Sequence, residues 1–187
     1  RIKQICLTNN NILDINNIFY NRCALKPSIQ DYKSMENEFE IDKDDIYNPE
    51  GERDYGIQGS SDAHVTILYG IHKDVPDKDV ESLIDKMTAP EVTLGKIGMF
   101  DNKDKGFDVV KFDVSGEDLH DMNKMFTELP HTNDFPDYHP HATLSYVNAG
   151  TGKDYTKTLS KEDTLVVKPN KVVYSKANGD KKEYTLK

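Results

Sequence analysis

The chain has 187 residues, of which 36% are hydrophobic and 30% charged, a composition typical of a soluble globular protein with a single domain spanning residues 1–187. Its formal net charge of −9 disfavours long DNA or RNA as the main ligand, because proteins that follow a polyanion usually set basic side chains against the phosphates. The sequence shows neither an apolar run of transmembrane length nor a secretory leader, so we expect a cytoplasmic protein without a membrane partner.

The N-terminal third of the chain predicts one helix followed by a long polar segment. Residues 11–26 carry apolar side chains at helical spacing, which favours a helix. Residues 27–62 include several prolines and glycines, and residues 31–62 hold eleven acidic side chains. We interpret residues 27–62 as an acidic loop or insertion within the domain, because a segment this polar cannot form a core of its own.

From residue 64 onward the apolar pattern becomes regular. An apolar run predicts a strand over 64–71, and one-sided apolar spacing predicts a helix over 77–87. The remaining elements expected in chain order are a hairpin of strands 91–100 and 107–114, a helix over 117–129, a strand over 141–147, a short helix over 153–159, and strands over 164–168, 171–175 and 183–186.

Two of the expected strands begin with the same pattern. Residues 64–69 read HVTILY and residues 141–146 read HATLSY, at a separation of 77 residues. That separation is too long for a solenoid repeat and indicates a duplicated half-domain.

The repeated pattern points to acid–base chemistry. Alternate residues of a strand share one face, so His64 lies with Thr66 and His141 with Thr143. If the two strands pair near the middle of a sheet, both imidazoles and both hydroxyls converge on one cleft. There one histidine can remove a proton and the other can donate one, in either assignment, while the hydroxyls bind phosphate oxygens. This chemistry needs no metal or other cofactor, and no Cys/His cluster has zinc spacing.

The paired His-x-Thr strands resemble the 2H phosphoesterase superfamily, which includes LigT-type 2′-5′ RNA ligases, over about residues 63–187. The resemblance implies an α+β, bilobal and duplicated fold, with a concave antiparallel sheet and helices on its outer faces. It also implies that His64, Thr66, His141 and Thr143 are the catalytic residues. The segments HVTILYG and HPHATLSYV are similar to sequences of phage anti-CBASS nucleases, which destroy the cyclic oligonucleotide alarm signals of infected bacteria.

The expected function is therefore a metal-independent phosphodiesterase that cleaves 3′-5′ bonds of a small cyclic oligonucleotide, in the host cytoplasm if the protein is encoded by a bacteriophage. Two alternative enzymes are an RNA 2′,3′-cyclic phosphodiesterase and a 2′-5′ oligoadenylate phosphodiesterase. A non-enzymatic alternative is a sponge that sequesters the signal, although binding alone does not require two acid–base imidazoles.

Substrate binding should also involve residues outside the histidine–threonine quartet. Aromatic rings stack on nucleotide bases, and Tyr32, Tyr47 and Tyr55 of the acidic insertion are candidates for this contact. We expect the insertion to cover the bound nucleotide as a lid. His139, which precedes Pro140 and the second motif, is expected to line the mouth of the cleft.

Overall fold

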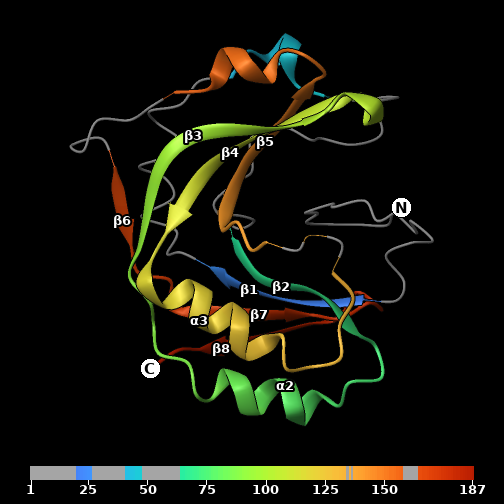
Figure 1. Cartoon of the computed structure of the whole chain (residues 1–187), viewed down its shortest axis with the longest axis vertical. Coiled ribbons are helices and arrows are strands. Elements are labelled where there is room, and N and C mark those ends of the chain that lie inside the picture. Colours follow the sequence, from blue (N-terminus) through green and yellow to red (C-terminus); the bar gives the residue numbers. More distant parts are fainter. Residues whose placement is uncertain (1–19, 27–40, 48–63, 134, 136, 158–163) are drawn as a thin grey trace.

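A single curled sheet organises the molecule. The computed structural model describes residues 20–26, 41–47, 64–133, 135, 137–157 and 164–187. Within these ranges eight strands pair antiparallel in the order β6-β3-β4-β5-β2-β1-β7-β8. The strands are β1 (Tyr20–Lys26), β2 (Val65–His72), β3 (Val92–Asn102), β4 (Phe107–Ser115), β5 (His141–Asn148), β6 (Leu165–Val167), β7 (Lys171–Ser175) and β8 (Lys181–Thr185). The sheet bends strongly between β5 and β2 (Figure 1).

The two strands that begin with the repeated pattern, β2 and β5, are neighbours at the centre of this sheet. Strands β4, β3 and β6 continue outward from β5, whereas β1, β7 and β8 continue outward from β2. Each lobe thus contains one copy of the pattern together with strands from distant parts of the chain. The predicted bilobal α+β fold with a concave antiparallel sheet is confirmed.

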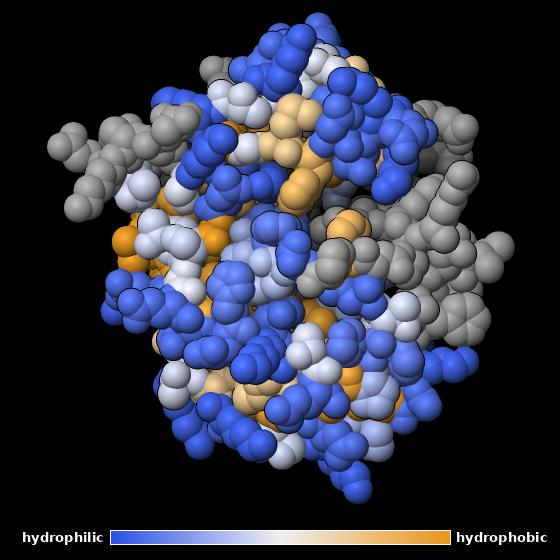
Figure 2. Space-filling view, in the orientation of Figure 1, coloured by the Kyte–Doolittle hydropathy of each residue, from blue (hydrophilic) through white to orange (hydrophobic). Residues whose placement is uncertain are grey.

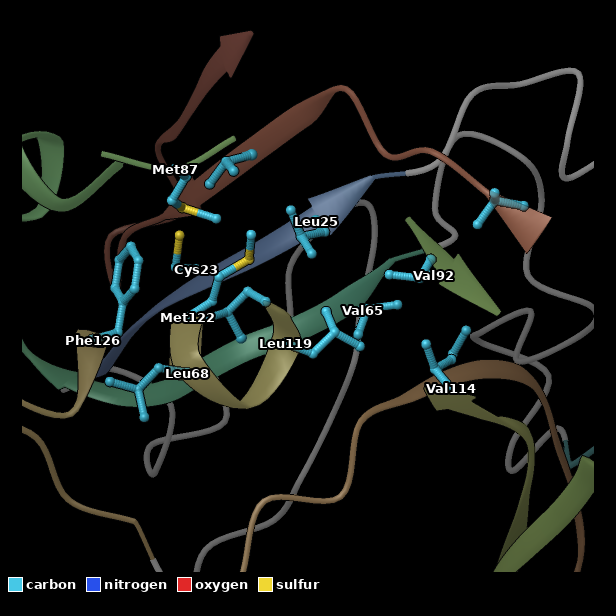
Figure 3. Close-up of a cluster of buried hydrophobic side chains, with 14 of the residues drawn as sticks. Cys23, Leu25, Val65, Leu68, Met87, Val92, Val114, Leu119, Met122 and Phe126 are labelled. Atoms are coloured by element: carbon cyan, nitrogen blue, oxygen red, sulfur yellow. The ribbon is translucent and has the colours of Figure 1, made fainter. Parts of the chain in front are cut away.

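Two α-helices cover the outer side of the lobe that contains β1, β2, β7 and β8 (Figure 1). They are α2 (Asp77–Ile84) and α3 (Glu117–Phe126). Helix α3 buries Leu119, Met122 and Phe126, which its 3.6-residue period brings to one face. These side chains pack over Cys23 and Leu68 of the sheet (Figure 3). Each fully buried apolar side chain contributes roughly 1.5–3 kcal/mol, so this layer holds β2 firmly in position.

Residues 20–26 form strand β1, so the predicted helix over residues 11–26 is wrong where the structure describes it. This segment lies between β2 and β7 and pairs with both. Cys23 and Leu25 are fully buried, and burial raises the pKa of the Cys23 thiol. Pairing on both edges together with this burial outweighs the helical spacing of the apolar residues, which is a local signal only. The part of the prediction over residues 11–19 lies outside the described residues.

One part of the acidic insertion, residues 41–47, packs against the end of the other lobe. Ile41 is 4% exposed and belongs to the hydrophobic core, and Ile46 forms an isolated bridge with Val147 of β5. Between them lies the 3-10 helix η1 (Lys43–Asp45). The Tyr155 hydroxyl, in η4 (Gly152–Tyr155), donates to Asp45 Oδ2 at 2.6 Å. This stretch is therefore anchored to the sheet, while residues 27–40 and 48–62 of the insertion lie outside the described ranges.

Hydrophilic residues dominate the face of the molecule seen in Figure 2, and apolar residues appear there in small scattered areas. Among the described residues, no helix combines the length and apolar character needed to cross a membrane.

Candidate active site

The four residues of the two His-x-Thr patterns come together where β2 and β5 pair. Val65 lies opposite Ala142 in this antiparallel pair, and both side chains are buried. By strand alternation their flanking residues lie on the other, inner face. Continuing the register by one residue in each direction sets His64 opposite Thr143, and Thr66 opposite His141. Of these, His64 is 7% and Thr143 8% exposed, whereas Thr66 and His141 are partly exposed. The structure brings the quartet together, while its catalytic role remains a prediction.

The ring of His141 is oriented from two sides. Its Nδ1 lies 2.8 Å from the carbonyl oxygen of His139. Because a carbonyl only accepts hydrogen bonds, Nδ1 carries the proton and Nε2 is the basic nitrogen of the neutral ring. The Phe100 ring of β3 meets the imidazole edge-to-face at a centroid distance of 4.9 Å. His141 is thus held in one tautomer and one orientation, as a general base requires.

His139 supports this site through its backbone. Its carbonyl oxygen is the partner of His141 Nδ1, while its own side chain is exposed. The predicted contact between the His139 side chain and a substrate stays a prediction.

The surroundings of His141 lower the pKa of its imidazole. Burial is the largest cause, because it disfavours the charged ring. The positive charges of Lys111 and His64 act in the same direction, whereas the hydrogen bond to the His139 carbonyl and the charge of Asp113 oppose the shift. The lowered pKa favours the neutral His141 imidazole, which is the form that can accept a proton.

Two further side chains hold the backbone of β2 beside the quartet. The Tyr138 hydroxyl donates to the Thr66 carbonyl at 3.0 Å, and Asn123 Nδ2 of α3 donates to the Ile67 carbonyl at 2.7 Å. Burial raises the pKa of the Tyr138 phenol, so the hydroxyl keeps the proton that it donates. Sequence reasoning missed both residues, because their partners are main-chain atoms more than fifty residues away.

Sequence reasoning also missed Lys111 and Asp113 of β4. Lys111 lies opposite Thr143 in the sheet and Asp113 lies opposite His141. Lys111 is 8% exposed although it carries a charge. A lysine within the otherwise apolar run Val109–Phe112 was the available signal, since buried lysines are rare unless paired.

Of the three tyrosines predicted to stack on a base, the structure describes Tyr47. Its ring lies 5.2 Å from that of Phe107, which in turn is 5.5 Å from the ring of Tyr146. The Tyr47 backbone N–H donates to the Tyr146 carbonyl at 3.0 Å, three residues along β5 from Thr143. Tyr47, Phe107 and Tyr146 thus form a cluster of aromatic rings toward the end of β5, the strand that carries Thr143. Tyr32 and Tyr55 lie outside the described residues.

No group of three or more His, Cys, Asp or Glu side chains that could hold a metal ion occurs in the part of the chain that the structure describes.

Solved structures with the same fold have little sequence in common with this chain. Usb1 of Kluyveromyces marxianus has a TM-score of 0.55 at 10% identity, with 89% of this chain and 98% of that chain covered. Escherichia coli LigT in complex with 3′-AMP has a TM-score of 0.54 at 14% identity, covering 90% and 95%. A Thermus thermophilus protein, TT0787, has a TM-score of 0.52 at 14% identity, also covering 90% and 95%. These similarities establish the fold, which is the one that the family resemblance implied.

A family match adds a relationship at the level of sequence. No curated protein matches the chain, but the family model described as anti-CBASS protein Acb1 matches residues 56–182, more than half of its length. The matched range includes both His-x-Thr strands. The resemblance to the 2H phosphoesterase superfamily and to its anti-CBASS members is thereby confirmed, and the chain belongs to the anti-CBASS protein Acb1 family.

Proposed function

We propose that this protein is a metal-independent phosphodiesterase that cleaves 3′-5′ bonds of small cyclic oligonucleotides, and so removes the signal of a bacterial antiviral response. The observation that carries the proposal is the pairing of two His-x-Thr strands at the centre of the sheet, with one imidazole kept neutral and in a defined tautomer. In a phosphoryl transfer one imidazole can remove a proton from the attacking hydroxyl, and the other can donate a proton to the leaving oxygen.

In the proposed mechanism, Nε2 of His141 accepts the proton of the ribose 2′-OH next to the scissile phosphate. The 2′-oxygen then forms a bond to phosphorus, and the bond from phosphorus to the 5′-oxygen breaks. The imidazolium of His64 gives its proton to the departing 5′-oxygen. The hydroxyls of Thr66 and Thr143 donate hydrogen bonds to the non-bridging oxygens, whose negative charge grows in the transition state.

This step opens the ring and leaves a 2′,3′-cyclic phosphate. Water attacks that phosphate in a second step, in which the two histidines exchange their roles as acid and base. The lowered pKa of His141 supports its assignment as the base of the first step, because a base must be unprotonated at the working pH.

Three observations favour a small substrate over a long strand. The net charge of −9 disfavours a long polyanion. The family is described as anti-CBASS. Finally, LigT, which has the same fold, has been solved with the mononucleotide 3′-AMP.

A panel of substrates tests the proposal directly. The protein is incubated in excess EDTA with a cyclic dinucleotide, a cyclic trinucleotide, a 2′-5′ oligoadenylate and an RNA that ends in a 2′,3′-cyclic phosphate. We expect a cyclic oligonucleotide to give linear products at the same rate with and without EDTA, because protein side chains neutralise the charge of the phosphate.

Cleavage of only the RNA end or only the 2′-5′ bond identifies an alternative enzyme. Tight binding without products identifies a sponge, and loss of activity that a divalent cation restores contradicts the mechanism.

The acidic limb of the pH–rate profile gives a second test. His141 must be neutral to act as the base, and its pKa is lowered, so the ring stays neutral at pH values where an ordinary histidine is already protonated. We therefore expect the acidic midpoint of kcat/KM, which reports the free enzyme, to lie below 6.5, the ordinary pKa of histidine. A midpoint above 6.5, measured at cyclic oligonucleotide concentrations well below KM, would argue against this assignment.

A further inference from the structure

Next to the quartet, the sheet carries a charged pair that the mechanism above does not use. Lys111 and Asp113 lie on the same face of β4, two residues apart, and their side chains form an ion pair. The two partners differ in exposure, since the Lys111 side chain is 11% exposed and that of Asp113 is 48% exposed. A largely buried ammonium with a half-exposed counter-ion is an unusual arrangement, because taking a charge out of water costs free energy.

The neighbouring strands are built around this ammonium. Lys111 Nζ lies 4.6 Å from the centre of the Phe100 ring, over its face, in a cation–π contact. On β3 the residue opposite Lys111 is Gly98. A Cβ at position 98 would lie 3.4 Å from Lys111 Nζ and within 3.7 Å of both Asp113 carboxylate oxygens. The charged pair therefore packs directly against the backbone of Gly98.

The Lys111 ammonium group belongs to a strand that pairs with the strand of His141 and Thr143. Lys111 is the cross-strand neighbour of Thr143, and Asp113 is that of His141. Phe100, whose face contacts the ammonium, also touches the His141 ring. The positive charge of Lys111 lowers the pKa of His141.

Resting on the function proposed above, we propose that Lys111 is a phosphate-binding residue of this site, and that Asp113, Phe100 and Gly98 hold its ammonium in position. An ammonium has three N–H donors, so the bond to Asp113 leaves donors for an oxygen of the substrate. The proposed phosphodiester carries negative charge before the reaction and more in the transition state. The threonine hydroxyls are neutral donors, whereas Lys111 adds a full positive charge in a poorly hydrated environment, where charge-assisted hydrogen bonds are strong.

A purely structural ion pair makes a different prediction from a phosphate-binding lysine. Lys111→Met and Asp113→Asn both abolish the ion pair, so a structural role predicts similar effects in the two variants. A phosphate-binding role predicts opposite effects. Lys111→Met removes the cation that binds the anion, whereas Asp113→Asn keeps an oxygen acceptor for Lys111 and removes a negative charge that competes with the phosphate.

Binding of inorganic phosphate tests the proposal without requiring turnover. We expect Lys111→Met to raise the Kd for phosphate at least about tenfold, Lys111→Arg to restore most of the affinity, and Asp113→Asn to leave the Kd unchanged or lower it. Lys103→Met is the matched control, because Lys103 pairs with Asp101 two residues away on an exposed part of the hairpin. We expect this control to bind phosphate like the wild-type protein.

The pKa of His141, followed by NMR, gives a second readout. The charged groups around this ring are His64, which directly precedes β2, and Lys111 and Asp113 on β4. Removing the cation in Lys111→Met should raise the pKa of His141, and removing the anion in Asp113→Asn should lower it. Equal phosphate affinity in folded wild-type and Lys111→Met proteins, or no phosphate binding by wild type, would overturn the proposal. Failure of the wild-type protein to cleave any cyclic oligonucleotide would instead overturn the proposed function.

Discussion

Replacing either histidine of the quartet by alanine should lower turnover of a cyclic oligonucleotide by at least about a hundredfold, the usual scale for the loss of a general acid or base. In the proposed mechanism His64 and His141 each transfer a proton, and the threonine hydroxyls cannot take over this role because they are neither acidic nor basic near pH 7. Affinity for the substrate should fall much less than turnover, because the hydroxyls still bind the phosphate. Single-turnover rates and a separate binding measurement distinguish the two effects.

His131→Ala is the matched control for this experiment. His131 Nδ1 lies 2.8 Å from the carbonyl oxygen of Leu129, two residues earlier, which is the local arrangement that His141 has with His139. His131 belongs to neither His-x-Thr strand, and its bridge to Ile71 of β2 uses main-chain atoms that alanine retains, so its replacement should leave turnover within a few-fold of wild type. Near-wild-type turnover in a folded His64→Ala or His141→Ala variant would disprove the mechanism, as would an equally large loss in the control.

A substrate with a better leaving group separates the two roles. A nitrophenyl ester of a nucleoside 3′-phosphate releases nitrophenolate, which needs no proton from an acid. If His64 is the acid, His64→Ala should cleave this ester at a rate close to wild type, whereas His141→Ala should remain slow because the 2′-OH still needs a base. The reverse result would exchange the two assignments.

The central part of the site could be predicted because it depends on local patterns. Alternation along a strand fixes which side chains share a face, so His64 with Thr66 and His141 with Thr143 follow from the sequence. That the two histidines and two threonines converge was predicted on the condition that the two strands pair near the middle of a sheet. The pairing of Val65 with Ala142 meets this condition.

The surroundings of the site depend on cross-strand register, which the sequence does not reveal. Lys111 lies beside Thr143 only because the pairing of β4 with β5 shifts register between Val110 and Lys111. Strand β1 was missed for a related reason, since its strand conformation depends on partners forty or more residues away. Residues that act through main-chain atoms, such as Tyr138 on the Thr66 carbonyl, leave no motif at all.

The contact between β2 and the loop that carries Tyr138 has a specific requirement at Gly70. Gly70 has a φ of +87°, and a Cβ built there would lie 1.9 Å from the carbonyl oxygen of Thr132. The same loop is bound to β2 by two main-chain hydrogen bonds, from Thr132 N–H to the Gly70 carbonyl and from His72 N–H to the Pro130 carbonyl, both 2.9 Å long. A side chain at position 70 therefore cannot be accommodated unless the loop moves and these bonds break.

We expect Gly70→Ala to lower the free energy of unfolding by about 3 kcal/mol or more. Positive φ alone costs an alanine about 1–2 kcal/mol, and each lost hydrogen bond adds about 1 kcal/mol. Gly150→Ala is the control that isolates the first contribution, because Gly150 has a φ of +94° with nothing within 4 Å of the added Cβ. Urea unfolding of the two variants and wild type measures the difference. Because the displaced loop also carries the Tyr138 hydroxyl that holds the Thr66 carbonyl, the folded fraction of Gly70→Ala should lose turnover while Gly150→Ala keeps it.

Equal destabilisation by the two substitutions would contradict this prediction. It would show that the loop accommodates the added methyl group at no cost, and that its hydrogen bonds to β2 do not hold the first His-x-Thr strand in position.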